Sequence, residues 1–310
     1  MGDRLKDRVG IVTGAGRGIG RAEALMLAEE GAAVIVNDFG GSAAGEGEEK
    51  SPADEVVEAI KAAGGKAAAN YGNIASFETG EQLVQQAIDT FGRLDIVVNN
   101  AGILRDRMIS NMSEQEFDAV IAVHLKGHFN LARHACVAFR QQRSGVIVNT
   151  SSEAGLGTTP GQPNYAAAKE GIVGMTRSLA FDMGRYGVRC NAIRPRAATR
   201  LTLSDEMKAA AQRPGAKGLS LDMLEMFEKV NPPEGVAPMV VWLCTDEASN
   251  VNGRTFMVAG NHIALYSEPT IVAEVKTDHV WTVDELSTLL PEQVTKDLVN
   301  RSAPKEAAKA

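Results

Sequence analysis

The sequence has little cysteine and no long hydrophobic run. Its three cysteines, Cys136, Cys190 and Cys244, lie far apart and form no Cys-x-x-Cys pair. An odd number of dispersed cysteines argues against a disulfide framework, so we expect buried thiols in a reducing compartment. Every apolar run falls short of the roughly 20 residues that a membrane span needs. The charged first ten residues contain no apolar segment of a secretory signal. We therefore expect a soluble, cytoplasmic protein.

Positive charge is also in deficit. The chain carries 32 Lys and Arg against 39 Asp and Glu, a formal net charge of −7. Such a chain is a poor partner for the phosphates of nucleic acids or for an anionic membrane. No His and Cys residues have the spacing of metal ligands. With 44% hydrophobic and 23% charged residues, the composition is that of a globular protein. We expect a small-molecule substrate, no nucleic-acid or membrane partner and no metal.

Short apolar runs alternate with helical stretches along the first 260 residues. Uninterrupted apolar strands separated by helices are typical of a parallel sheet with helices on both faces. The expected fold class is α/β: a doubly wound, seven-stranded parallel sheet, Rossmann-like, as a single domain over residues 1–260. The strands are expected at residues 9–13, 33–37, 66–71, 94–99, 146–150, 188–193 and 254–258. The helices are expected at residues 19–30, 51–63, 78–91, 113–140, 165–186 and 233–244.

Two segments exceed what this fold requires. Residues 39–50 form a glycine-rich, acidic loop after the second strand. Residues 261–310 form a C-terminal extension, in which we expect one helix at 283–290 and a frayed, charged tail.

A glycine-rich turn follows the first strand. Such a turn lets the backbone approach a diphosphate, and the helix N-terminus that follows supplies N–H groups and a positive dipole end. Asp38 ends the second strand, where a carboxylate can accept both hydroxyls of an adenosine ribose and repels a 2′-phosphate. Arg17 would attract that phosphate, but Asp38 is expected closer to the ribose, so NAD is favoured over NADP. A tight structural turn is the alternative. The residues predicted here to bind the dinucleotide are Gly14, Gly16, Arg17, Gly18, Ile19, Gly20 and Asp38.

Tyr165 and Lys169 are four residues apart and therefore lie on one face of a helix. The pair alone is common on protein surfaces, but Ser152 follows the fifth strand, at the sheet edge where open α/β proteins bind ligands. A phenol has a pKa of about 10, and a nearby ammonium together with the positive nicotinamide favours its anion. Tyr165 could then accept the proton of a substrate hydroxyl as hydride leaves. Ser152 would hold the substrate oxygen, and Lys169 would also bind the nicotinamide ribose.

Five motifs in order resemble the short-chain dehydrogenase/reductase family over about residues 5–260. They are the glycine turn at 13–20, Asn99-Asn100-Ala101-Gly102, Ser152, Tyr165-x-x-x-Lys169 and Asn191-Ala192-Ile193-x-Pro195. The resemblance implies that further residues contact the cofactor, namely Asn73, Ile74, Asn100, Ala101, Gly102, Tyr165, Lys169 and Pro195. His124 stands where the family usually has an asparagine that holds a water in a proton relay, and imidazole could serve there. A histidine bonded only to backbone is the alternative. Family members are usually homodimers or homotetramers.

A narrower resemblance concerns the substrate. Residues 37–41, 99–107 and 123–127 are similar to the (3R)-hydroxyacyl-CoA dehydrogenase module of the multifunctional enzyme of peroxisomal β-oxidation. Residues 111–129 are also similar to bacterial dehydrogenases of steroid side-chain CoA thioesters or of 17-hydroxysteroids. This implies an NAD-dependent enzyme of lipid metabolism that oxidises a 3-hydroxyacyl-CoA to a 3-ketoacyl-CoA. Free 17-hydroxysteroids or other alcohols are alternative substrates, and a non-catalytic regulatory protein is a further alternative.

The family places a mobile substrate lid after the sixth strand, here residues 200–233. Within it, residues 219–227 have the apolar spacing of an amphipathic helix. That helix either packs on the core or offers a methionine-rich pocket to a bulky apolar substrate. Four arginines near the expected mouth could meet CoA phosphates or be solvated surface groups; they are Arg105, Arg107, Arg196 and Arg200.

Overall fold

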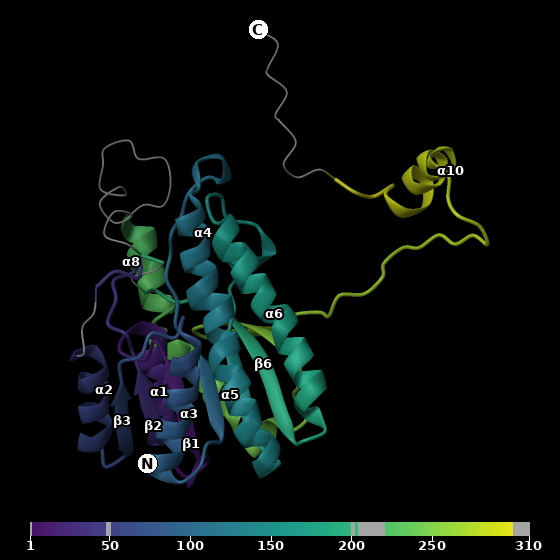
Figure 1. Ribbon diagram of the computed structural model, residues 1–310. Helices are drawn as coiled ribbons and strands as arrows, with labels where there is room; N and C mark the ends of the chain where they lie inside the picture. Colours follow the sequence, from purple (N-terminus) through teal and green to yellow (C-terminus); the bar gives the residue numbers. More distant parts are fainter. Residues whose placement is uncertain (1, 48–50, 200–201, 204–220, 300–310) are drawn as a thin grey trace. The chain divides into compact units, whose positions relative to one another are not determined.

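The computed structural model describes residues 2–47, 51–199, 202–203 and 221–299 (Figure 1). The chain divides into two units, one up to Tyr266 and one from Ser267 onward. Most of the lid predicted at 200–233, Arg200 included, and the tail predicted at 300–310 lie outside the described residues.

The first unit contains one eight-stranded sheet in the order β3-β2-β1-β4-β5-β6-β7-β8. Strands β1 to β7 are parallel, and β8 pairs antiparallel with β7. The doubly wound α/β class is confirmed, with all seven predicted strands present. The strands are β1 (Val9–Thr13), β2 (Ala33–Asn37), β3 (Lys66–Asn70), β4 (Ile96–Asn99), β5 (Gly145–Thr150), β6 (Val188–Pro195), β7 (Thr255–Ala259) and β8 (His262–Leu265).

Strand β8 is an addition that the sequence did not predict. It lies within the residues assigned to the C-terminal extension and follows a tight turn at Gly260. Its four residues are too few for a period of two to be distinguished from irregular chain.

Helices cover both faces of the sheet. Alternate strand residues point to opposite faces, so Val12 and Val98 enter one apolar cluster while Ile11 and Val97 enter the other. Helices α1, α2 and α9 close the first cluster, and α3, α5 and α6 close the second (Figure 1). These helices are α1 (Gly18–Glu29), α2 (Ser51–Ala62), α3 (Phe77–Phe91), α5 (Gly127–Gln142), α6 (Pro163–Gly184) and α9 (Ala237–Cys244).

The helix predicted at 113–140 is interrupted. It comprises α4 (Glu114–Ile121), a π-helical turn at Ala122–Lys126 and α5. Ser113 caps α4, because its Oγ accepts from the Glu116 N–H and the Glu116 carboxylate accepts from the Ser113 N–H. The π turn contains His124. Hydrophobic spacing does not reveal one extra residue in a helical turn, although such turns are frequent at functional sites.

The second unit contains α10 (Val283–Leu289), which a π-helical turn at Leu290–Val294 continues. Thr282 caps α10, because its Oγ1 accepts from the Glu285 N–H. Its own N–H donates to the Glu285 carboxylate. Within the described parts of both units, no helix has the length and hydropathy required to cross a membrane.

Candidate active site

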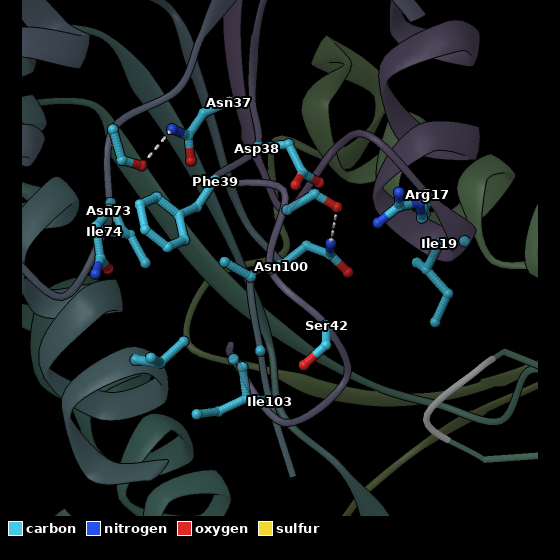
Figure 2. Close-up of a pocket in the computed structure, with 18 of the residues that line it drawn as sticks. Arg17, Ile19, Asn37, Asp38, Phe39, Ser42, Asn73, Ile74, Asn100 and Ile103 are labelled. Carbon is cyan, nitrogen blue, oxygen red and sulfur yellow. Dashed lines mark hydrogen bonds between the residues drawn. The ribbon is translucent and has the colours of Figure 1, made fainter. Parts of the chain in front are cut away.

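A cavity of about 330 Å³ opens where β1, β2 and β4 end. The strand order reverses between β1 and β4, which is where open α/β sheets bind ligands. Figure 2 shows the side chains around this cavity. Ten of the predicted cofactor residues line it: Gly14, Arg17, Gly18, Ile19, Asp38, Asn73, Ile74, Asn100, Ala101 and Gly102.

The turn after β1 brings bare backbone to the cavity. Gly14 has a φ of +63°, and a Cβ built on it would lie 2.8 Å from the Ala101 Cα. A Cβ on Gly20 would lie 2.3 Å from the Gly14 oxygen and 2.4 Å from Nδ2 of Asn100. Asn100 in turn donates from Nδ2 to the Thr13 and Gly14 oxygens at 3.0 and 3.1 Å. Side chains at these glycines would therefore push the turn away from β4.

Helix α1 begins at this turn with Gly18. Arg17 occupies the N-cap position without capping the helix by its side chain. The first N–H groups of a helix have no partners within it, and they carry the positive end of its dipole. Glycine backbone, free N–H groups and a positive dipole end fit the diphosphate of a dinucleotide.

Asp38 is held rigidly at the next strand end. Its Oδ2 accepts from the Gly16 N–H at 2.8 Å and its Oδ1 from the Gly40 N–H at 2.7 Å. The residue is only 8% exposed. Each carboxylate oxygen can accept a second hydrogen bond, so both remain able to bind ribose hydroxyls. Gly16 thus contributes through Asp38 rather than by lining the cavity.

Several lining residues were not predicted. Phe39 lies on the same side as Asn73 and Ile74 (Figure 2), which gives that side an apolar surface for a flat ring. A glycine-rich loop adds Ser42 and Gly45. The position of Phe39 directly after Asp38 was the available signal. The remaining unpredicted lining residues are Asn37, Gly41, Gly72, Ile103, Val123 and Thr199.

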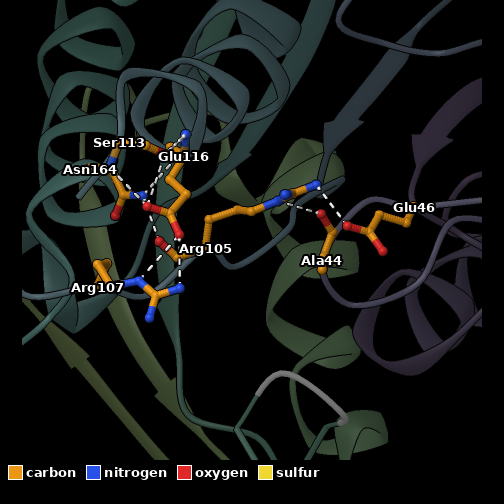
Figure 3. Close-up of polar contacts among 7 residues, drawn as sticks. All are labelled: Ala44, Glu46, Arg105, Arg107, Ser113, Glu116 and Asn164. Atoms are coloured by element: carbon orange, nitrogen blue, oxygen red, sulfur yellow. Dashed lines mark hydrogen bonds and ion pairs between the residues drawn. The ribbon is translucent and has the colours of Figure 1, made fainter. Parts of the chain in front are cut away.

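That loop is tied to the segment after β4 (Figure 3). The Leu104 N–H donates to the Ala43 oxygen at 3.0 Å, and Arg105 Nε donates to the Ala44 oxygen at 2.9 Å. The other end of the Arg105 guanidinium lies 3.4 Å from Oε1 of Glu46. The Arg105 side chain therefore fastens the loop beside the cavity.

The same segment supports the start of α6. Asn164 donates from Nδ2 to the backbone oxygens of Arg105 and Glu116 at 2.9 and 3.0 Å (Figure 3). Its Oδ1 accepts from the Tyr165 N–H at 2.7 Å. The segment after β4 is thus hydrogen-bonded both to the glycine-rich loop and to helix α6, which carries Tyr165.

The arginines expected at the mouth have carboxylate partners. Arg105 pairs with Glu46, and Arg107 pairs with Glu116 at 3.1 Å. Arg196 pairs with Glu153. The fourth, Arg200, lies outside the described residues. Three of the four positive charges are thus already shared with acids, which leaves less charge for CoA phosphates than the sequence suggested.

Ser152, Tyr165 and Lys169 come together at the end of β5. Lys169 is 2% exposed, and its Nζ donates to the Thr150 oxygen at 2.7 Å and lies 5.4 Å from the Tyr165 ring centre. Ser152 Oγ accepts from the Ala154 N–H at 3.2 Å, and its hydrogen bond with Tyr165 favours the phenolate. The trio predicted from the sequence therefore forms one cluster.

Burial dominates the ionisation of this cluster. It raises the pKa of Tyr165 to about 12, although the Ser152 hydrogen bond acts in the opposite direction. It lowers the pKa of Lys169 to about 7. The protein's own groups therefore do not give Tyr165 the depressed pKa that the nearby ammonium suggested, because desolvation opposes both charged forms.

His124 packs against Tyr165 from the π turn. The two rings meet edge to face with centres 5.1 Å apart. His124 Nε2 lies 2.8 Å from the Ile103 oxygen and 3.1 Å from the Ile103 nitrogen, while Nδ1 has no hydrogen-bond partner among the described residues. Burial, aided by the Lys169 charge, holds the pKa of His124 well below its usual range. The imidazole is therefore neutral and is bonded to the backbone of Ile103 through Nε2.

Ile103 contacts both the cavity and His124 beside the Ser152–Tyr165–Lys169 cluster. It lines the cavity, and its backbone bonds His124. Pro195, the last residue of β6, is half-buried, and neither it nor Tyr165, Lys169 or Gly20 lines the cavity.

A second cavity, of about 470 Å³, lies against α8 (Leu221–Val230). The helix confirms the amphipathic pattern expected there, since Leu224 is buried while Met223 and Met226 are exposed. The cavity walls are mostly apolar and are formed by Thr202, Leu203, Met223, Leu224, Met226, Phe227, Val230 and Asn231.

Comparisons with known proteins agree with this geometry. The sequence model of the family described as short chain dehydrogenase matches residues 8–210. Hydroxyacyl-CoA dehydrogenase ChsB1 of Mycobacterium tuberculosis is 43% identical over 295 residues, covering 92% of this chain and 88% of that protein. Peroxisomal multifunctional enzyme type 2 of Mus musculus is 44% identical over 274 residues, covering 88% of this chain. The chain matches only 34% of the length of that enzyme.

A solved structure gives the same result. The crystal structure of a short chain dehydrogenase from Mycobacterium avium superposes with a TM-score of 0.78 at 43% identity. The match covers 94% of this chain and 96% of the other.

Proposed function

Since the chain belongs to the short-chain dehydrogenase family and is an oxidoreductase, we propose that it oxidises a 3-hydroxyacyl-CoA to a 3-ketoacyl-CoA with NAD. The observation that carries the proposal is the cluster of Ser152, Tyr165 and Lys169 beside the glycine-turn cavity. The names of the mycobacterial and mouse relatives support the acyl-CoA class.

Each residue of the cluster has a part in moving one proton. Ser152 Oγ donates to the substrate oxygen, which leaves the substrate O–H aimed at Tyr165 Oη. The bound oxidised dinucleotide supplies the hydride acceptor and a positive charge. Tyr165 Oη takes the hydroxyl proton as the C–H bond breaks and the carbonyl forms. Lys169 Nζ lies beside the Tyr165 ring, and its ammonium form would favour the Tyr165 anion.

His124 would carry the proton onward. Its low pKa keeps the ring neutral, so when Nε2 donates to the Ile103 oxygen, Nδ1 is an acceptor. The alternative is that His124 only holds Ile103 in place, which the same hydrogen bond also supports.

We propose NAD rather than NADP because of Asp38. Its carboxylate is fixed by two backbone N–H groups beside the cavity, where it would accept ribose hydroxyls and repel a 2′-phosphate.

A second substrate class is a free 17-hydroxysteroid or another bulky secondary alcohol. The apolar cavity against α8 favours a large apolar group, whether it is an acyl chain or a fused ring. The pairing of Arg105, Arg107 and Arg196 with carboxylates weakens the case for a CoA-binding patch. A non-catalytic regulatory protein would not need the assembled Ser152–Tyr165–Lys169 cluster.

The test follows absorbance at 340 nm with NAD or NADP and a matched set of alcohols. The set contains (R)- and (S)-3-hydroxyacyl-CoAs, a steroid side-chain 3-hydroxyacyl-CoA and free 17-hydroxysteroids. We expect a CoA thioester to give the highest kcat/KM. Tyr165→Phe should abolish turnover and leave NAD binding, measured by calorimetry, unchanged. Turnover retained in Tyr165→Phe would overturn the mechanism, and turnover of free steroids alone would overturn the CoA assignment.

A homodimer or homotetramer is part of the proposal. The α5 and α6 surfaces expose apolar side chains, among them Phe129, Val137 and Phe181, the last of which is 90% exposed. Exposed apolar groups of this size are typical of protein interfaces. Light scattering on the purified protein tests this, and a monomer at micromolar concentration would contradict it.

A further inference from the structure

An arginine on β6 holds the backbone of the proposed substrate-binding serine. Arg194 is 3% exposed, and its Nη1 donates to the Ser152 carbonyl oxygen at 2.8 Å. Its Nη2 donates to Oε2 of Glu170 at 2.7 Å. Glu170 follows Lys169 in α6, so one guanidinium joins the chain after β5 to the helix that carries Tyr165.

Tyr266 stacks on this guanidinium. Its ring centre lies 5.1 Å from Cζ of Arg194, and its hydroxyl donates to Oε1 of Glu153 at 2.9 Å. Glu153 also pairs with Arg196. Tyr266 follows β8, and its N–H donates to the Thr255 oxygen of β7 at 3.0 Å. The unpredicted eighth strand thus places an aromatic ring on the arginine behind the active site.

Stability alone does not favour this arrangement. Desolvating a cation costs free energy that an ion pair returns only in part, and the buried Nε of Arg194 has no partner among the described residues. The surroundings are also crowded, because a Cβ on Gly155 would lie 3.1 Å from Nη1 of Arg194 and 3.0 Å from Oε2 of Glu170. Buried groups with incomplete hydrogen bonding and crowded surroundings are expected mainly at functional sites.

We propose that Arg194 is a positioning residue that fixes the direction of Ser152 Oγ, an inference that rests on the proposed function. The Ser152 carbonyl accepts from Arg194 and from the Gly155 N–H at 3.1 Å, while Ser152 Oγ accepts from the Ala154 N–H. Both the backbone and the side chain of Ser152 are therefore held. Its O–H, which bonds Tyr165 in the absence of substrate, is the donor that can turn to the substrate oxygen. Without Arg194, the peptide after Ser152 can rotate and carry Oγ out of line.

The experiment compares Arg194→Met and Arg194→Lys with a matched control on the same strand. Arg189 also donates to two carbonyl oxygens, those of Leu243 and Thr245, but it does so away from the site. Arg194→Met should lower kcat by roughly tenfold to a hundredfold, the cost of a misplaced group, with the Kd for NAD unchanged. Arg194→Lys should recover part of kcat, and Arg189→Met should leave kcat unchanged.

Hydrogen exchange measured by mass spectrometry gives a readout that does not need turnover. Exchange in the peptide covering residues 150–157 should be faster in Arg194→Met than in wild type or Arg189→Met. Tyr266→Leu, which removes the stacked ring and its hydrogen bond to Glu153 while leaving Arg194 in place, should shift exchange and kcat in the same direction by less. Unchanged exchange in that peptide, or an equal loss of kcat in Arg189→Met, would overturn the proposal. If wild type oxidises no alcohol, the proposed function fails while the exchange comparison still decides the role of Arg194.

Discussion

Glu23 is a fully buried carboxyl group, and it makes the stability of the fold depend on pH. It lies on α1 with 0% exposure, and neither carboxylate oxygen has a hydrogen-bond partner among the described residues. Burial raises its pKa from 4.5 to about 8. Across the interface with α9, the pKa of the Cys244 thiol is raised to about 12, first by burial and further by Glu23. The folded protein therefore keeps Glu23 protonated at neutral pH.

The sign of the effect follows from the order of the two pKa values. As pH rises, the unfolded state releases the Glu23 proton first, because its pKa is near 4.5. The stability contributed by the protonated group is thus complete below about pH 4.5, is lost progressively up to about pH 8 and is constant above that. Glu23→Gln removes this dependence. With pKa values of 4.5 and about 8, the variant should gain about 3.5 kcal/mol over wild type between pH 5 and pH 8.

Denaturant unfolding followed by circular dichroism measures this gain. Protein concentration is kept constant, because association of subunits also contributes to apparent stability. Glu29→Gln is the matched control, because it makes the same change at an exposed position of the same helix. A constant difference between Glu23→Gln and wild type from pH 5 to pH 8 would refute the reasoning.

Two further predictions concern the cofactor cavity. Asp38→Ser removes the carboxylate held by Gly16 and Gly40, so the ratio of kcat/KM for NAD to that for NADP should fall by roughly tenfold or more; an unchanged ratio would remove Asp38 from cofactor selection. Arg105→Ala frees the glycine-rich loop and should weaken NAD binding by about tenfold, the equivalent of one hydrogen bond, in calorimetry. Arg107→Ala, which breaks the pair with Glu116 and leaves the contacts of Arg105 with the loop intact, is its control, and equal weakening in both variants would contradict a role of the loop.

The parts of the site that could be predicted depend on residues that are close together in the sequence. These parts are the glycine turn, Asp38 at a strand end and the four-residue spacing of Tyr165 and Lys169. A turn between a strand and a helix needs glycine whatever surrounds it, and residues four apart share a helix face. The seven parallel strands could also be predicted, because strands buried on both faces are apolar throughout.

The π turn at His124 shows where this reading fails. One extra residue in a turn changes which side chains face the core, yet it leaves the hydrophobic pattern of a helix nearly intact. The consequence is chemical, since the turn directs His124 onto Ile103 and Tyr165. The pKa of Tyr165 has a similar origin, because burial raises it to about 12 and the degree of burial cannot be seen in the sequence.

Contacts between distant segments depend on the order of strands. Asp38 meets Gly16 because β2 lies beside β1, and Arg194 meets Ser152 because β6 lies beside β5. In each pair, the two residues are far apart in the sequence. In a parallel sheet, however, residues that follow adjacent strands must meet at one edge, so strand order alone narrows the candidates to a few residues per strand. Strand β8 has a role for the same reason. Its four residues add little to the hydrophobic core, but the strand extends the sheet by one position and brings Tyr266 into contact with Arg194.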